Sequence, residues 1–180
     1  MSSAEGRPTP IRQLFLLRHA KSSWENPQLA DHDRPLAPRG RRATNLIAEH
    51  LSGERIAPAL VLCSSARRAR ETLERITPAL GNEVAVRIER DLYAGSEHQL
   101  LDRLRAVSDA AASVMLIGHN PAVEQLALTL ARSGEKVAII ERKYPTGALG
   151  TLEFSGSWRE LGPGGAELTA FVTPKDLAKH

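Results

Sequence analysis

The chain has 180 residues, of which 42% are apolar and 25% are charged. This length and composition predict one globular domain with a sizeable core; they disfavour a two-domain protein or a solenoid array and exclude a disordered chain. We expect a polar N-terminal tail over residues 1–12 and a single domain over residues 13–180. The aromatic residues, three Phe, two Trp and two Tyr, are too few for a stacking platform that binds single-stranded nucleic acid.

The charges and the single cysteine narrow the possible partners. There are 24 Lys and Arg against 21 Asp and Glu, a net charge of +3. Acidic and basic residues alternate without a long basic run, and this pattern is compatible with an anionic substrate. Only the basic sequence pI of about 9.3 favours nucleic-acid binding. Cys63 is the only cysteine, so an internal disulfide and every multi-cysteine metal site are excluded. Neither a signal peptide nor a run of about 18 apolar residues is present, and we expect a cytoplasmic protein with no membrane partner.

Apolar runs and helical stripes alternate along most of the chain. Continuous or alternating apolar runs predict strands at four places: 14–17, 59–62, 84–88 and 114–117. Apolar residues at helical spacing follow each strand: 43–51, 69–80, 100–107 and 123–130. Two further strands, 148–154 and 167–172, would pair as an edge hairpin. The alternation predicts an α/β fold, a three-layer α/β/α sandwich around a mostly parallel sheet.

Several polar residues stand where these helices should begin. Ser64, Ser65 and Asn120 are N-cap candidates, and Pro121 suits the first helical position. A further pair, Ser96 with Gln99, has the spacing of a capping box.

Chemically active residues follow three of the predicted strands. Ligands of open α/β sheets bind beyond the carboxyl ends of the strands. Arg18 and His19 follow the first strand, an arginine-rich helix start follows the second, and His119 follows the strand at 114–117. We therefore expect two histidines and a set of arginines to converge at one edge of the sheet.

Arg67, Arg68 and Arg70 begin the helix after the second predicted strand. This placement is unusual, because a helix N-terminus carries partial positive charge and favours acidic side chains. Glu71 and Glu74 stand four residues after Arg67 and Arg70, which predicts exposed ion pairs for these two. Arg68 has Thr72 at that spacing instead. Arg68 is therefore the arginine that we expect to bind an anion, and phosphate matches the donor geometry of a guanidinium group.

The histidines have more than one possible role. A neutral imidazole can attack phosphorus when guanidinium groups neutralise the phosphoryl oxygens, and His19 beside Arg18 fits this role, with His119 as a hydrogen-bond donor. His19 could also simply cap the core through a carbonyl. A metal site from His19, His119 and residues 31–33 is disfavoured, because the spacing matches no compact ligand motif and Arg18 would repel a cation. The remaining histidines are interpreted as structural: His50, His98 and His180.

The run Leu16-Leu17-Arg18-His19-Ala20-Lys21-Ser22 resembles the arginine-histidine-glycine signature of the histidine phosphatase superfamily, with Ala20 in place of the glycine. The SixA-type phosphohistidine phosphatases are the branch that it resembles most. Further matching segments follow in the expected order: 33–36, 39–40, 61–72, 117–121 and 144–148.

The resemblance implies a phosphohistidine phosphatase that needs no metal or cofactor. His19 would be the nucleophile that becomes phosphohistidine, and Arg18, Arg68 and His119 would hold the phosphoryl group. The implied partners are a phosphohistidine-bearing protein and phosphate ion. Larger members carry a glutamate that protonates a leaving oxygen, and Asp91 is the nearest candidate here. A P–N bond weakens once its imidazole is protonated, so a site poor in catalytic carboxylates favours N-phosphates.

Two alternatives remain at this point. One is a small-molecule phosphomonoesterase of the same superfamily, although the short chain leaves little room for a cap that would enclose a sugar phosphate. The other is a non-catalytic phosphoprotein-binding module. In the loop over residues 21–34, Trp24 is either a lid or partner contact or a surface aromatic packed on Pro27.

Overall fold

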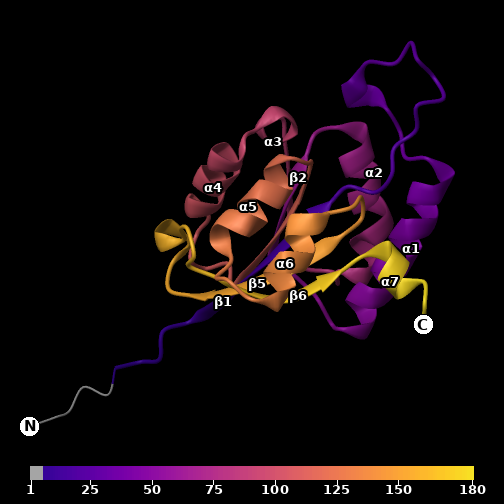
Figure 1. Cartoon of the computed structure of the whole chain (residues 1–180). Helices are drawn as coiled ribbons and strands as arrows, with labels where there is room; N and C mark the ends of the chain where they lie inside the picture. The colour runs from indigo at the N-terminus through magenta and orange to yellow at the C-terminus, as the bar shows by residue number, and fades with distance from the viewer. Residues whose placement is uncertain (1–5) are drawn as a thin grey trace, which may run out of the picture.

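The computed structural model describes residues 6–180 (Figure 1). Residues 1–5 of the expected tail lie outside this part of the chain. The elements are β1 (Ile11–Arg18), α1 (Pro38–Gly53), β2 (Leu60–Ser64), α2 (Arg67–Ile76), β3 (Ala85–Glu89), α3 (Asp91–Ala94), α4 (Glu97–Arg105), β4 (Ser113–Gly118), α5 (Ala122–Leu130), α6 (Glu135–Arg142), β5 (Leu149–Ser155), β6 (Glu167–Val172) and α7 (Pro174–Leu177). Three 3-10 turns join them, at Asp31–Asp33, Thr77–Ala79 and Trp158–Glu160. Over residues 6–180, no helix combines the length and apolar character needed to cross a membrane.

The six strands form one mixed sheet in the order β3-β2-β4-β1-β5-β6. The first four strands of the chain run parallel, and β5 and β6 are antiparallel, which confirms the mostly parallel sheet and the C-terminal hairpin. In register, Leu17 of β1 and Cys63 of β2 both lie beside Ile117 of β4. The carboxyl ends of β1, β2 and β4 therefore meet at one edge, as the sequence predicts.

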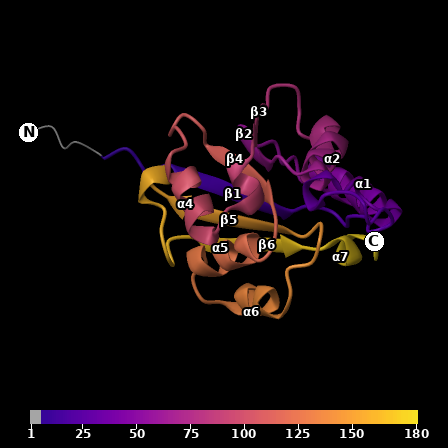
Figure 2. The same cartoon turned by 90° about the horizontal axis from the view of Figure 1, so that it is seen from above.

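Helices cover both faces of the sheet, because consecutive side chains of the buried strands are apolar and successive side chains point to opposite faces. Leu14 and Leu16 of β1 face the core formed with α3, α4, α5 and α6. Phe15 and Leu17 face the second core, formed with α1 and α2. Figure 2 shows α1, α2 and α7 together on one side and α4 and α5 on the other. The α/β sandwich predicted from the sequence is confirmed.

Two of the predicted helix caps are wrong. The N-cap of α2 is Ala66 and that of α5 is Pro121, and neither helix has a side-chain cap. The side chains of Ser64 and Asn120 instead bond to groups at the sheet edge. The predicted capping box of Ser96 and Gln99 does form at the start of α4.

A close backbone contact fixes the segment that follows β1. A Cβ atom on Gly40 of α1 would lie 2.1 Å from the Lys21 carbonyl oxygen, so only glycine fits there. The same oxygen accepts a hydrogen bond from the Ala37 amide at 2.8 Å. The start of α1 thus holds residues 20–22 beside the end of β1.

Candidate active site

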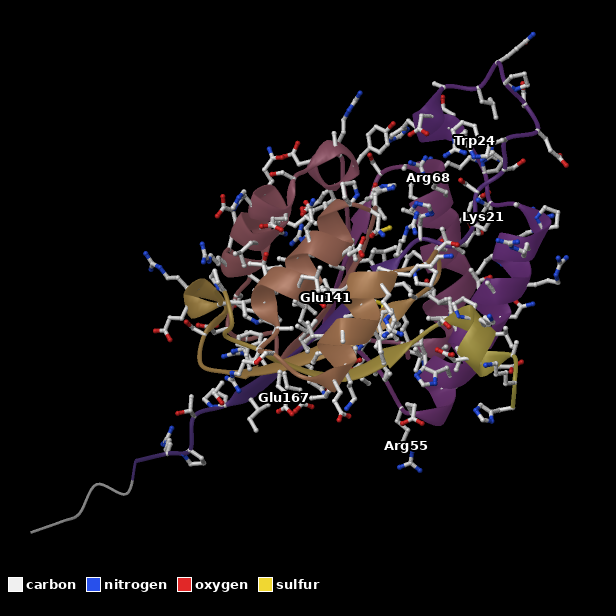
Figure 3. The ribbon with its side chains drawn as sticks, in the orientation of Figure 1. Lys21, Trp24, Arg55, Arg68, Glu141 and Glu167 are labelled. Carbon is white, nitrogen blue, oxygen red and sulfur yellow. The ribbon has the colours of Figure 1, made fainter. Side chains whose placement is uncertain are left out.

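His19, Arg68 and His119 come together at the carboxyl edge of the sheet, as the sequence predicts. Arg68 Nε lies 3.4 Å from His19 Nε2, and Arg68 Nη2 lies 3.4 Å from His119 Nδ1. The two imidazole rings have centroids 4.9 Å apart. In the view of Figure 3, Arg68, Lys21 and Trp24 appear toward the end of the molecule opposite Arg55. The three side chains therefore form one site from three separate elements.

The orientation of the His19 ring is set by its neighbours. Nδ1 lies 2.7 Å from the carbonyl oxygen of Ala20, which can only accept, so Nδ1 carries the hydrogen. Nε2 consequently presents its lone pair toward Arg68. Burial, aided by the nearby cations, lowers the pKa of His19 to about 3, so the ring is neutral at neutral pH. The structure thus holds an unprotonated ring nitrogen against a guanidinium group.

His119 is fixed by a residue that the sequence analysis treated only as a helix cap. Ser64 Oγ lies 2.7 Å from His119 Nε2 and also accepts a hydrogen bond from the Ala66 amide at 3.2 Å. Burial and the charge of Arg68 lower the pKa of His119 to about 4. A serine hydroxyl can donate or accept. When His119 Nε2 donates to Ser64, Nδ1 accepts from Arg68 Nη2; when Ser64 donates to Nε2, Nδ1 carries the hydrogen and can donate it to an anion.

Arg18 lies under the loop that precedes β5. Its Nη1 donates to the Tyr144 carbonyl at 2.9 Å, and Asn120 Nδ2 donates to the same oxygen at 3.0 Å. Arg18 Nε is buried without a hydrogen-bond partner among the described residues. Burial lowers the pKa of this guanidinium. The charge of Arg18 also contributes to the lowered pKa values of His19 and His119, so Arg18 brings a positive charge to the site.

Arg68 is held from both sides. Its Nη1 donates to the Asp31 carbonyl at 2.8 Å and its Nη2 to Asp31 Oδ2 at 3.0 Å. On the other side, Thr72 Oγ1 donates to the Arg68 carbonyl at 2.7 Å and accepts from the Ala20 amide at 3.1 Å. Thr72 thereby ties the segment after His19 to the helix that carries Arg68. The anionic partner comes from the loop, and no signal in the α2 sequence indicates it.

Asp31 is an ionised carboxylate. The Tyr93 hydroxyl donates to its Oδ2 at 2.7 Å, and Arg34 Nε donates to its Oδ1 at 3.1 Å. The bond from Tyr93, together with Arg68, lowers the pKa of Asp31 to about 2. Asp91, which the family resemblance suggested as a proton donor, is exposed at the first position of α3. The residue of α3 that contacts the site is Tyr93, which the sequence analysis missed.

The outer arginines behave differently from one another. Arg67 pairs with Glu71 at 3.5 Å, as predicted. Arg70 Nε donates to the Ser65 carbonyl at 2.8 Å rather than to the predicted Glu74.

Within residues 6–180, no three His, Cys, Asp or Glu side chains gather in a geometry that could hold a metal ion.

Arg34 holds the loop at 21–34 through contacts with both Trp24 and Asp31. Trp24 is 69% exposed, and the Arg34 guanidinium carbon lies 3.4 Å from its ring centroid. The stacking partner of Trp24 is thus Arg34, where the sequence analysis considered Pro27. Arg34 in turn binds Asp31, so this stack is linked to Arg68.

Comparison with known proteins agrees with this geometry. Residues 14–95 match the model of the histidine phosphatase superfamily, branch 1. The uncharacterised Mycobacterium tuberculosis protein Rv1276c is 37% identical over 163 residues, which cover 88% of this chain and 100% of that protein. The chain belongs to the histidine phosphatase superfamily.

Solved structures relate this superfamily member to SixA-type proteins. A Nakamurella multipartitia protein that carries the name SixA has a TM-score of 0.81 and 32% identity, covering 93% of this chain and 99% of that one. The protein histidine phosphatase SixA in complex with tungstate has a TM-score of 0.76 at 24% identity, covering 92% and 99%. The latter shares the fold, and the former extends the similarity to sequence.

Proposed function

We propose that this histidine phosphatase superfamily member is a metal-independent phosphohistidine phosphatase that acts on phosphohistidine-bearing proteins through a covalent intermediate on His19. The orientation of His19 carries the proposal, because its Nδ1 bonds to the Ala20 carbonyl and its Nε2 lone pair faces Arg68. Tungstate, a phosphate analogue, bound to SixA supports an oxyanion-binding role for the same fold.

The reaction has two steps. Arg18 and Arg68 bind the phosphoryl oxygens and neutralise their charge, and the neutral ring of His119 donates a hydrogen bond to them. His19 Nε2 attacks phosphorus in line, the P–N bond to the substrate breaks, and the substrate imidazole leaves with the proton that its other nitrogen carries. Water then attacks the same phosphorus, the bond to His19 breaks, and both hydrogens of the water leave with dihydrogen phosphate.

The acid–base properties of the site favour an N-phosphate substrate. A phosphate ester must protonate its leaving oxygen, whereas a protonated phosphoimidazole releases a neutral ring. Asp31 is bonded to Arg68, but with a pKa of about 2 it is ionised and cannot supply a proton at neutral pH. Substrates that carry their own proton on the leaving group are therefore the better match.

A rapid-quench experiment tests the proposal. Wild type and His19→Ala are mixed with a peptide carrying ³²P-phosphohistidine and quenched in alkali, in which phosphohistidine is stable. We expect label on wild type, none on His19→Ala, and free phosphate accumulating with wild type alone. His98→Ala, on the exposed first turn of α4, is the matched control and should label normally.

Three outcomes would overturn the proposal. Label on His19→Ala would exclude His19 as the nucleophile. Faster turnover of small phosphomonoesters than of the phosphohistidine peptide would favour the phosphomonoesterase alternative. Binding of the peptide with neither label nor phosphate release would favour a binding module.

A further inference from the structure

A row of four rings leads outward from the nucleophile. The His19 and His119 centroids are 4.9 Å apart, those of His119 and Tyr93 are 5.6 Å apart, and those of Tyr93 and His32 are 4.7 Å apart. His19 is 6% exposed, whereas the side chain of His32 is 33% exposed. The row therefore begins at the buried nucleophile and ends at the protein surface.

The two outer rings are fixed in position. The Tyr93 hydroxyl donates to Asp31 at 2.7 Å, and His32 Nε2 lies 2.9 Å from Ser65 Oγ. The interplanar angle between Tyr93 and His32 is 85°, and that between Tyr93 and His119 is 76°. Edge-to-face arrangements of this kind are favourable contacts between aromatic rings. Hydrogen bonds to Asp31 and Ser65 thus fix the rings of Tyr93 and His32 in position.

In-line displacement determines where a leaving group must lie. The attacking and leaving atoms stand on opposite sides of phosphorus, so a group displaced by buried His19 departs toward the surface. The Arg68 guanidinium carbon, which would hold the phosphoryl group, lies 5.9 Å from the Tyr93 ring centroid. Tyr93, with His32 next to it in the row, is therefore the aromatic surface nearest to Arg68 that a ring attached to that phosphorus could contact.

We infer that Tyr93 and His32 form an aromatic subsite that selects N-phosphates whose leaving group is an imidazole ring over those whose leaving group is an aliphatic amine. This inference rests on the proposed function and adds the residues that determine its specificity. A contact between aromatic rings stabilises a complex by more free energy than the buried area alone accounts for. The additional free energy corresponds to about 2- to 10-fold in kcat/KM. An aliphatic amine gains no such contact from the two rings.

The experiment compares two substrates that differ in the leaving group. One peptide carries phosphohistidine, and the other carries phospholysine at the same position. kcat/KM is measured for both with wild type, Tyr93→Leu, Tyr93→Phe and His32→Leu, and with His98→Leu as a control outside the site. The ratio of the two values cancels effects on phosphoryl binding that both substrates share.

We expect Tyr93→Leu and His32→Leu to lower the ratio by about 2- to 10-fold. Tyr93→Phe keeps the ring but loses the bond to Asp31, so it should lower both values together and leave the ratio unchanged. An unchanged ratio in both leucine variants, or an equal fall with Tyr93→Phe, overturns the inference while the proposed function stands. Wild type that hydrolyses neither peptide overturns the proposed function and this inference with it.

Discussion

Replacement of Arg68 by alanine separates the chemistry of the site from its stability. Arg68 is 6% exposed and lies 3.4 Å from both His19 Nε2 and His119 Nδ1. Loss of one fixed donor to transition-state charge costs about 100- to 1000-fold in rate, or about 3–4 kcal/mol. We therefore expect kcat/KM of Arg68→Ala to fall by about that factor.

The stability of the folded state should fall much less than the activity in Arg68→Ala. Asp31 retains its bonds from Tyr93 and Arg34, and its side chain is 47% exposed, so water can replace the missing guanidinium. We expect a loss of about 1–2 kcal/mol in unfolding free energy, which lowers Tm by roughly 2–8 °C for a chain of this size. The pKa values of His19 and His119 should both rise, because Arg68 lowers both in the wild type.

The assay combines steady-state kinetics on the phosphohistidine peptide, thermal unfolding and NMR titration of the imidazole rings. Arg67→Ala is the matched control, because Arg67 precedes Arg68 but forms only an exposed pair with Glu71. This variant should keep both activity and Tm. The reasoning is refuted if Arg68→Ala keeps kcat/KM within tenfold of wild type, or if Arg67→Ala loses as much.

Two further predictions concern stability. His19 and His119 have folded-state pKa values of about 3 and about 4, below the unfolded value of about 6.5. The unfolded chain therefore binds more protons as pH falls from 6.5 to 4, and the unfolding free energy should decrease by up to about 1.4 kcal/mol per pH unit for each histidine. Denaturant unfolding at several pH values tests this, and a slope in His19→Asn as steep as in wild type would contradict it. Gly40→Ala should destabilise the fold by about 1–3 kcal/mol or more, because its Cβ would meet the Lys21 carbonyl. Gly53→Ala, with open space around its Cβ, should be neutral or stabilising by about 0.5–1 kcal/mol, and similar Tm values for the two variants would count against the argument.

The strands and long helices could be predicted from the sequence because burial leaves a local pattern. Four consecutive apolar residues at 14–17 indicate β1, and the stripe from Ala69 to Ile76 indicates α2. α3 and α7 have only four residues each, too few for a periodic pattern, and α6 buries only Ile140. The sequence pattern therefore predicted none of these three helices.

The site was predictable where its residues follow strands directly. His19 and His119 stand at strand ends, so the sheet-edge rule finds them. Asp31 reaches Arg68 only through the path of a loop, which no local pattern specifies. Tyr93 lies a few residues after β3, and applying the same rule to that strand could have found it. Ser64 is the N-cap of no helix, and its hydroxyl bonds both to the Ala66 amide and to His119, a contact that the helix-cap pattern does not indicate.

The position of β1 in the sheet has a consequence for the synthesis of the chain. Of the six strands of this sheet β1 is made first, yet its two neighbours are β4 and β5, with Leu17 beside Ile117 and Leu149. The apolar side chains of β1 therefore have no partner strand until β4 and β5 have been made. Such non-local pairing folds slowly and exposes a segment prone to association with other chains. We expect chains truncated before β5 to be aggregation-prone and bound by chaperones, because β1 then lacks one of its two neighbouring strands.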